Sequence, residues 1–444
     1  MRTNALSRVT QSVDSHTIGD YDSRQSRREP MASVVPIASR ASANLTADRI
    51  VAAIEAVTPK LQQNALAEEK AGRLSQQTIE ELDAIGVFRI SLPLEYGGSA
   101  LSTEDQRRVF AAVGAIAGST GWVSWVTTTH GRWIAMYPKA AQDEIYGLPW
   151  VGPRISGVLS PHGPGRARRV DGGYMISGRW PFASGCRHTA WIVLGSMVAG
   201  PDGKLDMIAP VVRTADLTVL DDWAVSGMKG SGSNTVELTD ELFVPEHRVM
   251  SMKDLSAGRW ASEPPAGQVL FRNNFLDYTS ILSGSTPLGM AKGALNYFRE
   301  RMDGRGIMGT DYKVQAEAPI AHFQLAEATA KIEAAERLLS ADCVELDRRA
   351  VAGEETDDLF QTKLKFDVAL SVRQCCEAIE TLHRASGAST VHEANPMQRY
   401  ARDARVATVH AHFNYETCAE NYGRALAGKP LFGNFNALEK KAAA

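Results

Sequence analysis

The spacing of apolar residues divides the chain into helical and strand-rich stretches. Ile50, Ile54 and Val57 recur at helical spacing shortly after Thr46, a residue type that caps helix N-termini. The same spacing predicts three further helices in the first third of the chain, over 75–85, 103–113 and 122–134. The first third is therefore expected to be mostly α-helical.

The middle of the chain follows a different pattern. Between residues 150 and 250, short β-rich runs are separated by turn residues such as Asp171-Gly172-Gly173, which predicts a compact antiparallel β domain. From Phe275 onward, long amphipathic patterns return over 276–303, 314–350, 356–387 and 397–427. Four long helices in succession predict an up-down bundle, whose apolar faces often carry contacts between subunits.

These patterns predict an α+β protein, mostly α, in five consecutive parts. They are a disordered leader (1–44), an N-terminal α-helical domain (45–150), a central β domain (151–255), a C-terminal four-helix bundle (256–430) and a tail (431–444). The leader is rich in Ser, Arg and Asp and lacks periodicity. The same composition would be expected if the protein started at Met31 and the residues before it were an upstream extension.

Composition excludes several classes of partner. The chain has 48 Lys and Arg against 51 Asp and Glu, a formal net charge of -3, so a nucleic-acid partner is disfavoured. Its five cysteines show no CxxC spacing, which predicts neither disulfides nor a metal site and favours a reducing cytoplasm. No run approaches the ~18 apolar residues of a membrane span, so no membrane association is expected.

Three motifs give the first indication of chemistry. They are GRWPFASG (178–185), GMKGSGSNT (227–235) with LFVPE (242–246), and PMQRYARDARV (396–406). In this order, with the α/β/α organisation, they resemble the acyl-CoA dehydrogenase superfamily of flavoproteins. The resemblance implies that fold, with Phe182 against the isoalloxazine ring and Ser184 hydrogen-bonded near its N5 atom.

The catalytic base of a dehydrogenase is missing, however. Removal of an α-proton from an acyl thioester needs a carboxylate. The two positions that carry this Glu in the superfamily correspond to Ala411 and Thr279. Neither side chain can act as such a base, so dehydrogenation is the less expected reaction.

Two histidines, His130 and His410, and the W-x-F-x-S-G-C-x-H-x-x-W pattern of 180–191 point to another branch. They resemble the oxygenase components of two-component flavin monooxygenases, the 4-hydroxyphenylacetate 3-hydroxylase oxygenase-like branch. The resemblance implies reduced FMN or FADH2 from a separate NAD(P)H:flavin reductase, O2 as co-substrate, and a C4a-hydroperoxyflavin that hydroxylates a small aromatic or polycyclic molecule. No G-x-G-x-x-G unit supplies a nicotinamide site in the chain itself.

The resemblance also implies roles for particular residues. Ser184 would prolong the life of the flavin adduct, and His130 with Ser160 would contact the substrate hydroxyl. His410 would lie by the flavin C4a edge as a proton donor, whereas His412, two residues further along a helix, is expected to face elsewhere. The residues expected to bind the flavin are Trp122, Phe182, Ser184, Arg272, Phe275, Ser386 and Gly387.

The expected assembly is a homotetramer. Three alternatives stay open at this point: a member of the same fold that oxygenates nitrogen or sulfur, an acyl-CoA dehydrogenase with a displaced base, and a catalytically idle scaffold.

Overall fold

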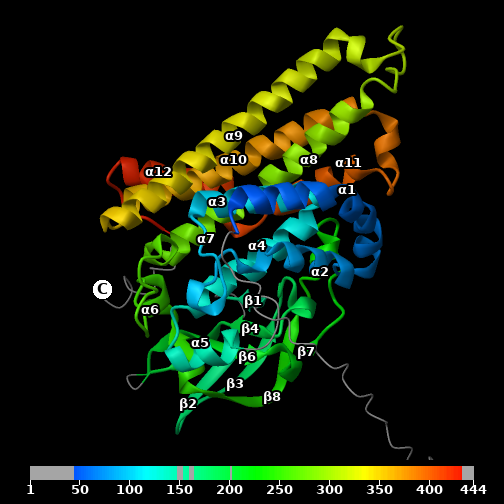
Figure 1. The fold of residues 1–444 in the computed structure, drawn as a ribbon. Helices are drawn as coiled ribbons and strands as arrows, with labels where there is room; N and C mark the ends of the chain where they lie inside the picture. Colours follow the sequence, from blue (N-terminus) through cyan, green and yellow to red (C-terminus); the bar gives the residue numbers. More distant parts are fainter. Residues whose placement is uncertain (1–44, 148–153, 160–164, 201–202, 433–444) are drawn as a thin grey trace, which may run out of the picture. The chain divides into compact units, whose positions relative to one another are not determined.

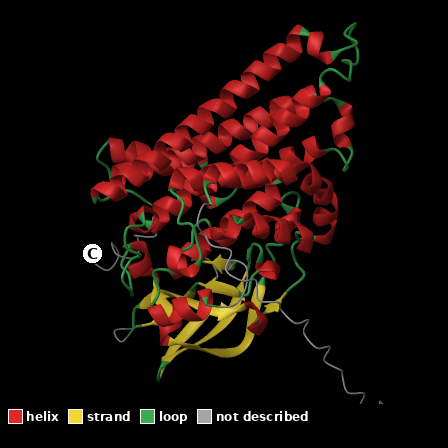
Figure 2. Cartoon of the chain, in the orientation of Figure 1, coloured by secondary structure: helices red, strands yellow, loops and turns green. Residues whose placement is uncertain are grey.

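The computed structural model describes residues 45–147, 154–159, 165–200 and 203–432 (Figure 1). The predicted leader, nearly all of the predicted tail and Ser160 lie outside these residues. The described residues belong to one compact unit. In it, helices α8 to α10 lie on one side of α3 and α4, and a β-sheet lies on the other (Figures 1 and 2).

The first part of the chain is helical, as predicted. Its helices are α1 (Ala47–Ala71), α2 (Gln76–Ile85), α3 (Thr103–Ile116), α4 (Gly118–Ile134) and α5 (Lys139–Tyr146). The Thr46 hydroxyl accepts a hydrogen bond from the Arg49 backbone N–H, so the predicted cap is confirmed. Every residue of α4 except His130 is buried, because this helix packs against α8 on one side and the first strand of the sheet on the other. Its buried residues include polar ones, such as Thr127, Thr129 and Arg132, which bond to backbone carbonyl groups.

The sheet is mixed rather than wholly antiparallel. Its strands are β1 (Ile155–Val158), β2 (Gly165–Val170), β3 (Gly173–Trp180), β4 (Trp191–Leu194), β5 (Ser196–Ala199), β6 (Leu205–Arg213), β7 (Thr218–Val219), β8 (Val236–Pro245) and β9 (Val249–Ser251). They lie in the order β1-β4-β6-β5-β2-β3-β8-β7, with β9 paired to β6. The pairs β1–β4 and β2–β5 are parallel, because a long excursion of the chain separates the two strands of each pair.

The last part of the chain contains more helices than the four predicted. They are α6 (Met252–Ser256), α7 (Phe275–Ser283), α8 (Ser285–Arg301), α9 (Pro319–Ala352), α10 (Asp358–Ala385), α11 (Pro396–Thr408) and α12 (Tyr415–Leu426). The predicted helix over 276–303 is two helices, since Pro287 has no N–H to continue a helix through Gly284. The predicted helix over 397–427 also breaks, and Asn414 starts α12 by accepting the Thr417 N–H.

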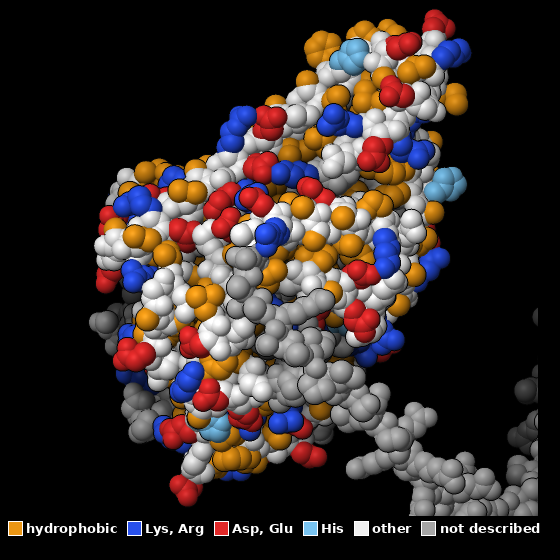
Figure 3. Space-filling view, viewed as in Figure 1, with side chains coloured by type: hydrophobic (Ala, Val, Ile, Leu, Met, Phe, Trp, Pro, Cys, Tyr) orange, Lys and Arg blue, Asp and Glu red, His pale blue; other side chains and the backbone are white. Residues whose placement is uncertain are grey.

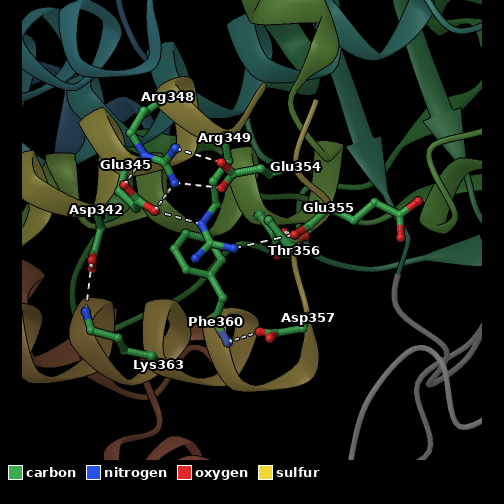
Figure 4. Close-up of polar contacts among 11 residues, drawn as sticks. Asp342, Glu345, Arg348, Arg349, Glu354, Glu355, Thr356, Asp357, Phe360 and Lys363 are labelled. Carbon is green, nitrogen blue, oxygen red and sulfur yellow. Dashed lines mark hydrogen bonds and ion pairs between the residues drawn. The ribbon is translucent and has the colours of Figure 1, made fainter. Parts of the chain in front are cut away.

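A cluster of charged side chains forms the turn between the two longest helices (Figure 4). Arg348 contacts Glu345 on its own helix and Glu354 beyond the helix end, each at 2.7 Å. The Arg349 guanidinium lies 4.2 Å from the centre of the Phe360 ring at the start of α10. Exposed pairs of this kind contribute little stability, about 0–1 kcal/mol each. The contacts that join α9 to α10 here are Arg349 with Phe360 and the ion pair of Lys363 with Asp342.

Candidate functional site

The segment after β3 exposes one aromatic ring and buries the next hydroxyl. Phe182 has φ 66°, an uncommon value for a residue with a side chain, and Gly185 follows with φ 70°. The turn leaves Phe182 67 % exposed, with its ring 5.8 Å from that of Trp223, whereas Ser184 is buried. A flat apolar surface therefore lies next to a buried hydroxyl group, and the flavin contacts expected of both residues stay predictions.

Ser184 is the first member of a row of three hydroxyl groups, here called the serine chain. Its Oγ lies 2.7 Å from Oγ of Ser233, which lies 2.8 Å from Oγ of Ser231. The indole N–H of Trp122 donates to Ser184 Oγ at 3.1 Å. A hydroxyl group has one donor and two acceptor positions. Ser184 therefore keeps one hydrogen-bonding position for a bound molecule.

Sequence reasoning missed Ser231 and Ser233, although it singled out the motif that contains them. The signal was the alternation of glycine and serine in Gly230-Ser231-Gly232-Ser233. A Cβ on Gly230 would lie 3.2 Å from Cβ of Ser119 on α4, so glycine permits the close approach of this turn to the helix. Small residues beside hydroxyl groups can thus indicate a turn packed into a site.

The third motif, on α11, forms hydrogen bonds and ion pairs that hold the turn of the serine chain in place. Asp403 Oδ1 accepts the backbone N–H of Met228 at 2.6 Å, and Met228 begins the turn with φ 56°. Burial raises the pKa of Asp403 to about 7. Two residues of the same helix, Arg399 and Arg402, contact Glu69 of α1 at 2.9 and 2.6 Å. The R-x-x-R-D pattern therefore joins α11 to α1 and to the turn.

One ring nitrogen of His130, Nε2, carries no proton. Its Nδ1 lies 2.8 Å from the carbonyl oxygen of Val126, and because a carbonyl only accepts, Nδ1 carries the proton. Burial lowers the pKa of His130 to about 4, so the ring is neutral at neutral pH and Nε2 is an acceptor. A Cβ on Gly157 would lie 2.3 Å from Nε2. The glycine of β1 therefore makes room for this ring.

His410 is in the opposite tautomer, with its proton on Nε2. The backbone N–H of His412 donates to His410 Nδ1 at 3.3 Å, which leaves the proton on Nε2. Burial lowers the pKa of His410 to about 4 and that of His412 to about 3. The prediction that only one of the two rings faces inward is wrong: both are partly buried, with ring centres 4.9 Å apart. The helix ends at Thr408, so helical spacing no longer applies.

Trp122 connects these groups. Its ring lies 4.8 Å from that of Trp125 and 5.2 Å from that of His410, while its N–H reaches Ser184. Trp122 and His130 are eight residues apart and share one face of α4. The structure therefore brings Ser184, Trp122 and His410 together, and places His130 two turns further along the same helix.

The remaining predicted flavin contacts lie elsewhere, and their roles stay predictions. Arg272 is exposed, whereas Phe275 is buried and stacks on Trp133 with ring centres 4.6 Å apart. The buried Ser386 hydroxyl donates to a carbonyl of its own helix at 2.8 Å, and Gly387 beside it is exposed. Within the described residues, none of these side chains contacts the serine chain.

Metal-binding and membrane-spanning features were sought in the described part of the chain. No three His, Cys, Asp or Glu side chains there gather as metal ligands, and all five cysteines are free. No helix in those residues has the length and apolar character needed to cross a bilayer.

Comparison with known proteins matches this geometry to a family. Models of the N-terminal and C-terminal domains of acyl-CoA dehydrogenases match residues 50–150 and 281–415. A flavin-dependent monooxygenase oxygenase subunit, HsaA of Rhodococcus jostii (strain RHA1), is 32% identical over 85% of this chain and 98% of its own. The chain belongs to the flavin-dependent monooxygenase oxygenase subunits. The acyl-CoA dehydrogenase-like fold predicted from the motifs is thereby confirmed.

Other members of this oxygenase family agree with the assignment. The p-hydroxyphenylacetate 3-hydroxylase oxygenase component of Acinetobacter baumannii is 28% identical over 84% of this chain and 88% of its own. The structure of XiaF from Streptomyces sp., in complex with FADH2 and glycerol, superposes with a TM-score of 0.80 at 28% identity, over 87% of this chain and 97% of that one. Membership of an enzyme family argues against the idle-scaffold alternative, and the dehydrogenase alternative gains no base from Ala411 or Thr279.

Proposed function

We propose that this oxygenase subunit uses reduced FMN or FADH2 and O2 to hydroxylate a small aromatic or polycyclic molecule. The observation that carries the proposal is a pair of neutral histidines with opposite tautomers: His410, whose ring contacts that of Trp122 beside Ser184, and His130, two turns further along α4. The printed names of the relatives support it, since they include hydroxylases of p-hydroxyphenylacetate and resorcinol.

The residues present fit a flavin. Phe182 offers an exposed ring surface for the isoalloxazine, and Ser184 keeps one hydrogen-bonding position for the N5 group. Arg272 is exposed and forms no ion pair among the described residues, so its guanidinium group is available to bind a phosphate. The reduced flavin supplies the electrons that activate O2.

The histidines act on the substrate and on the oxygen that is transferred. His130 Nε2 accepts the hydrogen of a phenolic hydroxyl group, which fixes the ring and draws electron density toward it. With a pKa of about 4, this imidazole orients and polarises the hydroxyl rather than holding a full proton. The Nε2–H of His410 donates a hydrogen bond toward the reacting oxygen, and Trp122 keeps water from Ser184.

The partners are proposed on separate grounds. The relatives are named as oxygenase subunits or components, and the chain has no nicotinamide motif, which supports a separate NAD(P)H:flavin reductase. A homotetramer is supported by exposed apolar side chains at and before the start of α9, those of Met308, Ile320 and Phe323. Figure 3 shows hydrophobic side chains at the upper end of the molecule, among charged ones. Light scattering of the purified protein tests the assembly. Free cysteines support a cytoplasmic location.

The hydroxylation test uses the purified chain, NADH and a generic flavin reductase. A panel of phenols is offered in air enriched in 18O2, and hydroxylated products are identified by mass. We expect one oxygen atom from O2 in the product, and a loss of product but not of flavin binding in His130→Asn. His392→Asn, at an exposed surface histidine, is the matched control. Reoxidation of the flavin without product from any phenol contradicts the proposal.

A further inference from the structure

A second group of polar side chains surrounds a cavity that the proposed reaction does not use. The cavity, about 470 Å³ in volume, lies between the end of α1, the 3-10 turn Cys186–His188 and the ends of β4 and β6. Its lining carries three guanidinium groups, those of Arg73, Arg187 and Arg213. A neighbouring cavity of about 470 Å³ shares Arg73 and Arg187.

Two of the three positive charges on this cavity have no acidic partner among the described residues. Among the described residues, Arg73 and Arg213 form no ion pair, and Arg213 lies over the Trp191 ring at 5.1 Å. Arg187 reaches Asp221 at 3.5 Å, but Asp221 is fully exposed, so water weakens this pair. No acidic side chain of the described residues lines the cavity, although the whole chain has a net charge of -3. The excess of positive charge is therefore local.

Two further acidic groups in this region, Glu68 and Asp83, have other partners. Glu68 accepts hydrogen bonds from the backbone and hydroxyl of Ser75, at 2.9 and 2.8 Å. Asp83 pairs with Arg154 at 2.9 Å, and burial raises the pKa of this carboxyl group to about 6. His188 stays neutral, because burial and the neighbouring arginines lower its pKa to about 4. None of these groups supplies the missing negative charge.

We propose that this cavity binds a phosphate-bearing small molecule. A planar guanidinium group can donate two parallel hydrogen bonds to the oxygens of a phosphate. Three such groups also carry more positive charge than a single carboxylate can neutralise. The hydroxyl groups of Thr189 and Thr214 on the same wall add further hydrogen-bonding positions. The volume is in the range of small-molecule sites. The shared chemistry is the phosphate group, carried either by a free phosphate anion or by a nucleotide.

The site has a direct connection to the serine chain. Arg187 lies in the 3-10 turn that begins two residues after Ser184, and Gly185 between them donates its N–H to the carbonyl oxygen of Ser231. A phosphate held by Arg187 would therefore hold this turn against the serine chain. Binding itself does not depend on the proposed hydroxylation, so failure of one proposal leaves the other standing.

Calorimetry on the purified full chain tests binding, with pyrophosphate and adenosine diphosphate as probes at constant ionic strength. We expect one binding event per chain and an affinity lowered about tenfold or more in Arg73→Gln and in Arg187→Gln. Arg187→Lys keeps the positive charge but cannot donate two parallel hydrogen bonds to one phosphate, so it should bind with intermediate affinity. Arg337→Gln, on the exposed face of α9, is the matched control and should bind as the parent protein does.

The two probes separate the sources of the phosphate. Tighter binding of adenosine diphosphate than of pyrophosphate supports the site with a nucleotide as its ligand, and equal binding supports it with the phosphate alone. The absence of heat with both probes overturns the proposal. Equal affinities in the parent protein, Arg73→Gln and Arg187→Gln overturn it too, because the anion then binds elsewhere. Melting temperatures without ligand show that the exposed substitutions leave the fold intact.

Discussion

Replacing Gly157 with alanine tests whether His130 must lie where the structure places it. The added Cβ would lie 2.2 Å from Cδ2 and 2.3 Å from Nε2 of His130. Because non-bonded carbon atoms pack at about 3.5–4.0 Å, the ring must move by more than about 1 Å. The move breaks the 2.8 Å hydrogen bond from Nδ1 to Val126. Overpacking of this kind costs about 1–3 kcal/mol of stability.

The effect on the reaction is expected to be larger than the effect on stability. A shift of about 1 Å in a reacting group can lower a rate by the order of 10²-fold. Product formation should fall by that factor in Gly157→Ala, while binding of reduced flavin is retained, since Trp122 and Ser184 are not displaced. The assay measures product against O2 consumed. Gly423→Ala, where the added Cβ meets nothing within 4 Å, is the matched control.

A double variant decides whether Gly157 acts through His130. If it does, Gly157→Ala combined with His130→Asn should form no less product than His130→Asn alone. Losses that simply add, or a parental product yield in Gly157→Ala despite a lower melting temperature, would refute this reasoning.

Three further predictions follow from the site. Ser233→Ala removes the partner 2.7 Å from Ser184 and should raise the ratio of H2O2 to product roughly 2- to 10-fold, whereas Ser226→Ala, at an exposed serine, should not; equal ratios would remove Ser233 from the site. His130 stays neutral down to a pKa of about 4, so product yield should not fall through pH 6.5; a decline there that His130→Asn abolishes would show that the ring is hydrated. Because the pKa of Asp403 is raised from 3.8 to about 7, the folded protein binds more protons than the unfolded chain in that window. The unfolding free energy contributed by this group therefore falls as pH rises from about 4 to 7, and Asp403→Asn should remove that slope from melting curves; a difference that is constant with pH contradicts the burial of the carboxylate.

The sequence by itself determined the features that depend on near neighbours. Helix positions follow from apolar spacing and from caps such as Thr46, whose hydroxyl group accepts an N–H group only three residues away. The three motifs identified the fold and the flavin-dependent family, since each is a short local pattern. The absence of a carboxylate at Ala411 and Thr279 separated the monooxygenase from the dehydrogenase.

Only the tertiary structure decided which of these residues meet. Trp122 and Ser184 are 62 residues apart and Ser184 and Ser233 are 49 apart, so no local pattern encodes their hydrogen bonds. The tautomer of His130 is set locally, by Val126 one turn earlier on α4, but the burial that keeps His130 and His412 neutral comes from tertiary packing. These features arise because packing brings distant segments together, and burial then fixes which polar atoms remain unpaired and which protons stay bound.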